Sequence, residues 1–129
     1  MKIRLLFLII WAIAAQQTTG QELQSNIDSL LIQLSTIKQD TARVRILEKV
    51  ASHYNVTALD SAKAFAVEGV ALADKLKDAS GRWRMRNVLG TYYERSTKYD
   101  SALLQYDDAL RIIDSLQSTR GYAVVLNNK

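Results

Sequence analysis

The sequence predicts an all-α protein, and three observations support this fold class. The chain of 129 residues contains no proline and only five glycines, the two residue types that most often interrupt helices. Apolar residues recur every three or four positions along most of the chain, which places them on one stripe of a helix. No segment alternates apolar and polar residues over a useful length, so β-strands are not expected.

The composition excludes several kinds of functional site. Without cysteine the chain cannot form a disulfide, a thiolate zinc site, a cysteine nucleophile or a lipid-modified cysteine, and its one histidine cannot form a multi-histidine metal site. The formal net charge is +4, but Lys2 and Arg4 lie in residues 1–20, which are expected to be a removable N-terminal leader. Without them 15 basic side chains face 13 acidic ones, a net charge of +2. This near-neutral balance argues against direct binding of nucleic acid.

Residues 1–20 have the three parts of a secretory signal peptide. Two basic residues precede an unbroken run of 11 apolar residues, Leu5–Ala15, and a short polar stretch comes after it. As a helix this run is roughly 16 Å long, about half of the hydrocarbon core of a bilayer, so a permanent membrane anchor is not expected. Cleavage after Gly20 is preferred, and cleavage after Ala14 is the alternative. We expect a periplasmic or secreted protein, whereas the competing interpretation is a buried N-terminal helix.

A leading amphipathic helix is expected in residues 21–39. Its apolar stripe consists of Leu23, Ile27, Leu30, Leu34 and Ile37. Asp40 and Thr41 then provide an N-cap for a second helix. The stripe of this second helix consists of Val44, Leu47, Val50, Ala51 and Tyr54.

A third helix is expected after a short connection at residues 55–59, with Asp60 or Ser61 as its N-cap. Its face of small side chains would let another helix approach closely; these are Ala62, Ala66, Gly69, Val70 and Ala73. Gly81 is the expected helix stop. A fourth helix then runs from Arg82 to about Thr97, a fifth from Asp100 or Ser101 to about Gln117, and Gly121 opens a sixth.

Four features recur with a period of about 40 residues and indicate an internal repeat. Asp60-Ser61 recurs as Asp100-Ser101, and Gly81 recurs as Gly121. The other correspondences are Ala62, Ala66 and Gly69 with Ala102, Tyr106 and Ala109, and Asn87 with Asn127. Because one hairpin cannot bury its apolar face alone, such a repeat predicts a stack of helical hairpins.

The later copy of this repeat resembles a tetratricopeptide repeat (TPR). In that family helix A carries a Leu-Gly pair with a tyrosine three residues on, and helix B carries small, aromatic and small positions. The matching residues here are Leu89, Gly90 and Tyr93 in helix A, and Ala102, Tyr106 and Ala109 in helix B. A looser copy has Ala51 and Tyr54 in helix A, and Ala62, Ala66 and Gly69 in helix B. Arg86 replaces a frequent tryptophan, no proline closes a repeat, and the period is longer than the family's usual period of about 34 residues.

The resemblance implies a short α-solenoid of antiparallel hairpins with a right-handed superhelix. Its repeats would occupy residues 40–80 and 81–120, and residues 121–129 would be the truncated start of a third. The whole arrangement is similar to the exported N-terminal TPR region of bacterial sensor and regulator proteins. We therefore expect a non-catalytic module that binds a protein or peptide, as a scaffold or a sensor region.

Two alternatives concern the protein beyond residue 129. The chain could be a fragment of a membrane-spanning signalling protein, a histidine kinase or a transcriptional regulator, whose output domain is missing here. It could also be a complete small protein. In either case the sequence indicates a membrane link only through the signal peptide or through a downstream segment.

No pattern in the sequence indicates an enzyme, a cofactor or a metal ion. His53 has no serine and acid arranged around it and is expected to be a partly exposed helix residue. Asp107, Asp108 and Asp114 are expected on the outward face of a helix, because metal-binding carboxylates usually come from an alternating loop or from converging helices.

Three arginines around a tryptophan suggest a nucleic-acid patch at first sight. Arg82, Arg84 and Arg86 surround Trp83. Residues two apart on a helix point about 200° apart, so these arginines do not form one basic stripe.

The candidate binding residues follow from the resemblance, since the family binds extended peptides or helices on a concave face lined mainly by helix A. The residues that would face this groove are Arg45, Glu48 and Ser52 in the first repeat, and Arg84, Asn87, Thr91 and Glu94 in the second. Asparagine can contact a peptide backbone through one donor and one acceptor, and arginine can pair with a carboxylate. The alternative is that each position simply faces solvent.

We predict that the exported protein begins at Gln21, because the small residues Thr18 and Gly20 form a cleavage site directly before the helical pattern. N-terminal sequencing of the protein recovered from the host envelope or medium tests this. A protein that still begins with Met1 would contradict the expected location.

Overall fold

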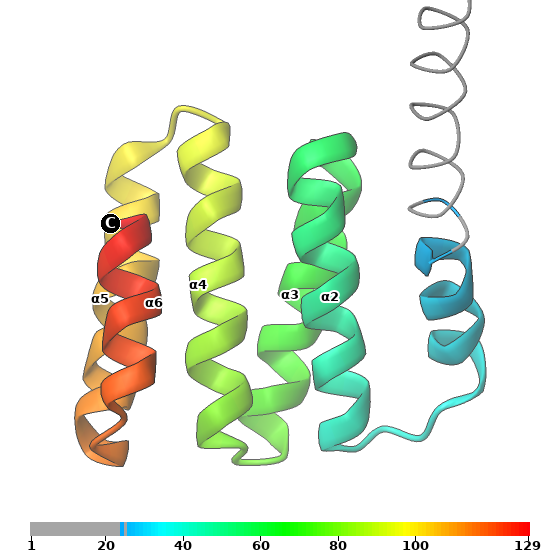
Figure 1. Ribbon diagram of the computed structural model, residues 1–129, viewed down its shortest axis with the longest axis horizontal. Helices are drawn as coiled ribbons and strands as arrows, with labels where there is room; N and C mark the ends of the chain where they lie inside the picture. The colour runs from blue at the N-terminus through cyan, green and yellow to red at the C-terminus, as the bar shows by residue number, and fades with distance from the viewer. Residues whose placement is uncertain (1–23, 25) are drawn as a thin grey trace, which may run out of the picture.

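The computed structural model describes residues 24 and 26–129, and this part of the chain is all-α, as predicted (Figure 1). A helical segment at residues 26–36 is followed by α2 (Thr41–Thr57), α3 (Leu59–Lys75), α4 (Ala79–Arg95), α5 (Tyr99–Leu116) and α6 (Thr119–Asn128). The predicted signal peptide, residues 1–20, lies outside the described residues. Within them, no helix has the length and apolar character needed to cross a membrane.

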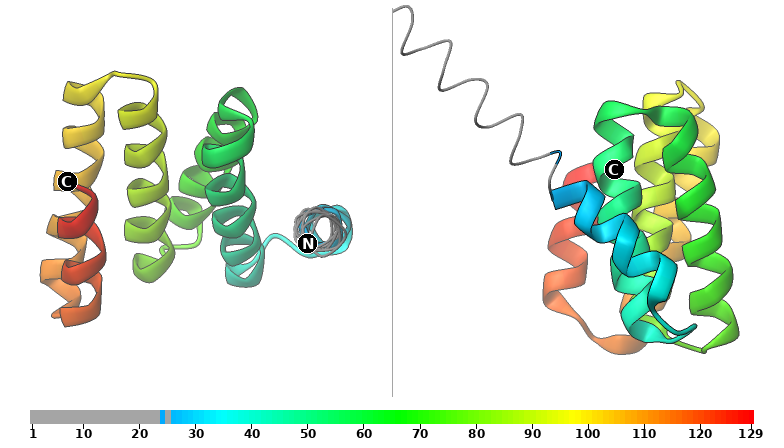
Figure 2. Two further views of the ribbon diagram at one scale, coloured as in Figure 1. Left: turned by 45° about the horizontal axis from the view of Figure 1, so that its top comes forward. Right: turned by 90° about the vertical axis from the view of Figure 1, so that its right-hand side faces the viewer.

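Consecutive helices from α2 to α6 pack as antiparallel neighbours (Figures 1 and 2). α4 contacts α3 and α5, its neighbours in sequence, and also α2 and α6. Contacts between α3 and α5 are absent from the described part of the fold. The helices therefore form two layers, with α2, α4 and α6 in one and α3 and α5 in the other.

The segment at residues 26–36 packs against the start of this stack. Ile27 and Leu34 are buried with the side chains of α2, and Leu30 and Ile37 are partly buried there, which confirms most of the predicted stripe. Leu23, its first member, lies outside the described residues. Arg43 of α2 donates a hydrogen bond to the backbone carbonyl oxygen of Leu34 and so holds the end of this segment.

Asp40 is the N-cap of α2, as predicted. Its Oδ1 accepts hydrogen bonds from the backbone N–H groups of Ala42 (2.9 Å) and Arg43 (3.2 Å), which would otherwise have no partner in the first turn.

The predicted caps of the next helices are wrong by two or three residues. α3 and α5 begin at Leu59 and Tyr99, after Ala58 and Lys98, so Asp60 and Asp100 lie inside the first turn. There the carboxylates complement the positive end of the helix dipole without capping it. The predicted connection at residues 55–59 is too long. Because α2 continues to Thr57 and α3 begins at Leu59, Ala58 alone connects the two helices.

Gly81 does not stop a helix and Gly121 does not begin one, contrary to the prediction. Each is the third residue of its helix, and its N–H donates to the capping side chain: Gly81 to Asp78 Oδ1 (2.9 Å) and Gly121 to Ser118 Oγ (3.2 Å). A Cβ on Gly81 would lie 2.8 Å from Val44 Cγ1. A Cβ on Gly121 would lie 2.9 Å from Ile113 Cγ1 of α5, so both glycines lie where another helix approaches closely.

The turns are made by residues other than glycine, at equal intervals along the chain. Lys77, Thr97 and Gln117 have left-handed backbone angles, with φ of 54°, 58° and 51°. In each turn the N–H of the following residue bonds a carbonyl oxygen five residues back; in the first turn Asp78 N and Ala73 O are 3.0 Å apart. These are Schellman motifs, and they end α3, α4 and α5.

The small-residue face predicted for the third helix is confirmed. Ala62, Ala66 and Ala73 of α3 are fully buried, whereas Val70 is partly buried. Gly69 lies against Met85 of α4, so close that a Cβ would be 2.3 Å from Met85 Cε.

A second close contact lies within the hairpin of α4 and α5. Gly90 of α4 faces the ring of Tyr106 on α5, and a Cβ there would lie 2.5 Å from Tyr106 Cε1. Tyr106 is buried with Ala102 and Ala109, and Tyr93 packs against the core of both hairpins. Tyr93 therefore links the two hairpins.

The spacing along the chain from the start of α2 to the start of α4 is slightly shorter than the predicted period. α3 and α5 start a full period apart, at Leu59 and Tyr99, but the capping residues Asp40 and Asp78 are closer to each other along the chain than one period. Counting from these caps aligns Leu89 with Ala51 and Tyr92 with Tyr54, one residue away from the predicted correspondence.

We predict that Gly90→Leu lowers the free energy of unfolding by about 3 kcal/mol, because the new side chain would overlap the buried ring of Tyr106. Thermal or urea unfolding followed by circular dichroism measures this. Ala64→Leu, at an exposed position of α3, is the matched control and should change stability little. Equal stability of the Gly90 variant and the wild type would contradict the close contact.

We predict that Thr97→Gly raises the free energy of unfolding by about 0.5–1 kcal/mol, since a β-branched residue is strained at a φ of 58° and glycine is not. Thr57→Gly is the control because Thr57 ends α2 without a left-handed φ, and it should give no gain. A loss of stability in the Thr97 variant would speak against the left-handed turn.

Candidate partner-binding groove

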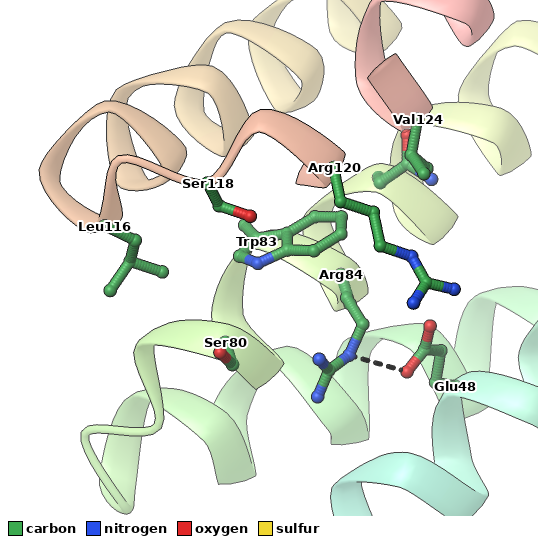
Figure 3. A pocket seen from close by; sticks show the side chains of 9 residues that line it. Glu48, Ser80, Trp83, Arg84, Leu116, Ser118, Arg120 and Val124 are labelled. Atoms are coloured by element: carbon green, nitrogen blue, oxygen red, sulfur yellow. Dashed lines mark hydrogen bonds and ion pairs between the residues drawn. The ribbon is translucent and has the colours of Figure 1, made fainter. Parts of the chain in front are cut away.

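A hollow of about 600 Å³ lies on the layer formed by α2, α4 and α6 (Figure 3). It is lined by Glu48, Ser80, Trp83, Arg84, Asn87, Leu116, Ser118, Arg120 and Val124. α2 contributes Glu48, α4 contributes four of these residues, and the rest come from α6 and from the end of α5 with the turn after it. We call this the first hollow.

A second hollow of about 420 Å³ lies between the segment at residues 26–36 and α2. Its lining consists of Asn26, Ile27, Leu30, Glu48, Lys49, Ser52 and His53. Glu48 lines both hollows, so they are neighbours on either side of this carboxylate. We call the two hollows together the groove.

The polar centre of the groove is an ion pair between α2 and α4. Arg84 Nε lies 2.9 Å from Glu48 Oε2, and the two side chains are only 26% and 29% exposed. Burial raises the pKa of Glu48 above its ordinary value of 4.5, and Arg84, Lys49 and Arg45 offset part of this effect.

Trp83 forms the apolar wall of the first hollow. Its ring is buried against Ala102, Tyr106 and other core residues of the second hairpin. The Arg84 guanidinium carbon lies 5.8 Å from the centre of a Trp83 ring, within the range of a cation–π contact. The tryptophan therefore helps to fix the direction of Arg84.

The arginines around Trp83 do not form one basic stripe, as predicted. Arg82 pairs with Asp74 of α3 at 2.6 Å, and Arg86 lies 3.5 Å from both Asp74 and Asp108 of α5. Arg84 points instead to the groove, where it pairs with Glu48.

The prediction of an outward-facing acidic cluster on α5 holds only in part. Asp114 is exposed, but Asp108 pairs with Arg86 and Arg111, and Asp107 pairs with Lys129 at 2.6 Å. Asp107 and Asp108 therefore face cations of α4 and of the chain end after α6 as well as solvent. Over the described residues, no group of three potential metal-ligating side chains occurs.

The structure brings three of the seven predicted groove residues together in the first hollow: Glu48, Arg84 and Asn87. Asn87 Oδ1 accepts a hydrogen bond of 3.1 Å from Asn128 Nδ2, a link between α4 and α6. Its predicted equivalent, Asn127, is the neighbour of that donor.

The other four predicted groove residues lie outside the first hollow. Ser52 lines the second hollow, whereas Arg45 is exposed and lines neither. Thr91 and Glu94 both contact the Tyr106 hydroxyl, which lies 3.4 Å from Thr91 Oγ1 and donates to Glu94 at 3.0 Å. These two residues thus support the second hairpin.

Sequence reasoning missed six residues of the first hollow: Ser80, Trp83, Leu116, Ser118, Arg120 and Val124. The repeat carried a usable signal for one of them. Val124 follows the predicted groove residue Arg84 by one period, so extending the repeat into the last helix would have found it, whereas Arg120 follows Ser80, which was not predicted. Leu116 and Ser118 come from the end of α5 and its turn, which the groove prediction did not consider.

His53 is a partly buried helix residue, as predicted. Its ring meets Tyr54 edge-on, with ring centres 5.6 Å apart, and Tyr54 in turn stacks on Phe65 of α3. It lies in the second hollow beside Lys49 and Ser52.

Comparison with known proteins gives no relative. The chain matches no protein-family model, no curated protein and no solved structure.

Proposed function

We propose that this protein is a non-catalytic, TPR-like module that binds an extended polypeptide along the groove. The observation that carries the proposal is that two hollows share Glu48 of α2, the first lined mainly by α2, α4 and α6 and the second by α2 and the segment at residues 26–36. A chain segment lying across these helices would meet polar groups from several of them in succession.

The chemistry of the lining supports a peptide as the ligand. The first hollow combines an aromatic wall, Trp83, with aliphatic Leu116 and Val124 and with the amide of Asn87. An amide side chain can bond both groups of a peptide unit, and apolar side chains of a ligand can pack on the wall.

The helical architecture supports the resemblance to TPR proteins. The small residues Gly69 and Gly90 each face a large side chain of the next helix, and the buried positions of one hairpin recur in the other. The leader in the sequence supports an exported location, and the proposal includes it.

Selection of linear peptides from a random display library on the purified protein tests this function. We expect the selected peptides to lose about tenfold or more in affinity with Val124→Glu, which places a charge on the apolar wall of the first hollow. The matched control is Ala64→Glu, at an exposed position of α3 away from the groove, which should bind as the wild type does. Peptides that bind both variants equally would contradict a role for the groove.

A further inference from the structure

The groove contains more positive than negative side chains. Its lining includes the cations Lys49, Arg84 and Arg120 and a single carboxylate, that of Glu48. The chain after the predicted leader, by contrast, has a net charge of only +2. An acidic ligand would therefore be attracted to the groove rather than to the protein as a whole.

Arg120 differs from the arginines of α4 that surround Trp83. Arg82, Arg84 and Arg86 each pair with a carboxylate, whereas none of the described carboxylates lies within ion-pair distance of Arg120. Figure 3 shows that the Arg120 side chain extends from α6 into the first hollow, toward Glu48. A second carboxylate in this hollow would thus have Arg84 on one side and Arg120 on the other.

Glu48 already occupies part of that space. Its Oε2 accepts from Arg84 Nε at 2.9 Å, as the carboxylate of a ligand would. A ligand carboxylate at this point would have to replace Glu48, because two like charges in a partly buried site repel each other.

On the basis of the proposed function, we propose that the partner is an acidic segment, and that Glu48 is an internal competitor whose place at Arg84 is taken by a partner carboxylate. Arg120 then pairs with the same or a neighbouring carboxylate of the partner. Glu48 turns away from Arg84 when the partner binds and returns when it leaves.

This exchange makes binding depend on pH. Burial raises the pKa of Glu48, and separation from Arg84 takes away the main group that counteracts this effect. Glu48 that is displaced from Arg84 therefore binds a proton more readily than Glu48 in the ion pair. A fall in pH favours this displaced, protonated state, so acidic ligands should bind more tightly at lower pH. The charged or titratable groups around Glu48 are Arg84 from α4, Arg120 from α6, and Arg45, Lys49 and His53 from α2; the segment at residues 26–36 contributes the neutral Asn26, Ile27 and Leu30.

The test uses three fluorescent peptides of equal length in a Gly-Ser background, one with four glutamates, one with four glutamines and one with four lysines. Fluorescence anisotropy gives their affinities at pH 7.5 and 5.5, where the peptide carboxylates remain largely ionised. We expect the glutamate peptide to bind about tenfold more tightly than the glutamine peptide, and more tightly at pH 5.5.

Matched variants separate the groups involved. Arg120→Gln should weaken binding of the glutamate peptide about tenfold, whereas Arg111→Gln, which removes the same charge from an exposed site on α5, should not. Glu48→Gln should strengthen binding and abolish its pH dependence, and His53→Gln should leave that dependence intact. Circular dichroism confirms that each variant is folded.

Three results would overturn the inference: equal affinity of the glutamate and glutamine peptides, weaker binding by Glu48→Gln, or equal losses in the Arg120 and Arg111 variants. The first of these would leave the proposed function standing, because a neutral peptide would still occupy the groove. The display selection tests the proposed function independently, and peptides that ignore Val124→Glu would contradict it whatever their charge.

Discussion

The close approach of helices at small residues is the constraint on which the rest of this structure depends. Gly90 lets the ring of Tyr106 lie directly against the backbone of α4, and Gly69 does the same for Met85 between α3 and α4. Because side chains set the separation of packed helices, the Gly69 contact brings the first hairpin close to the second, and the Gly90 contact brings the two helices of the second hairpin together. That closeness puts α2, α4 and α6 side by side, so that residues as distant in sequence as Glu48 and Arg120 line one hollow.

The helices and their buried faces could be predicted from the sequence because both follow from local periodicity. The boundaries could not be predicted as well, and the reason is specific. Glycine was expected to end the helices, but the left-handed turns use Lys77, Thr97 and Gln117, residues without a preference for that conformation. Gly81 and Gly121 are needed instead where helices approach each other, and a sequence shows a glycine without showing which of these two roles it has.

The candidate site was predictable only where it followed the repeat. Glu48, Arg84 and Asn87 lie on the predicted face of helix A and do share one hollow. Thr91 and Glu94 lie farther along α4 but contact Tyr106, because the hydroxyl of this buried ring needs polar partners. Pairing between helices is a tertiary property, so the period could not show which polar residues of helix A remain available to a ligand.

The position of the Glu48–Arg84 pair gives it a different role from the other ion pairs. Arg43–Glu68 and Arg82–Asp74 join helices that are consecutive in sequence and lie beside the hairpin contacts. Glu48–Arg84 joins α2 to α4 and faces the groove. Partly exposed pairs of this kind contribute about 1 kcal/mol or less to folding. The hairpins are held by buried alanines, glycines and aromatic rings, so this pair can open at little cost to the stability of the fold, as the proposed exchange with a ligand carboxylate requires.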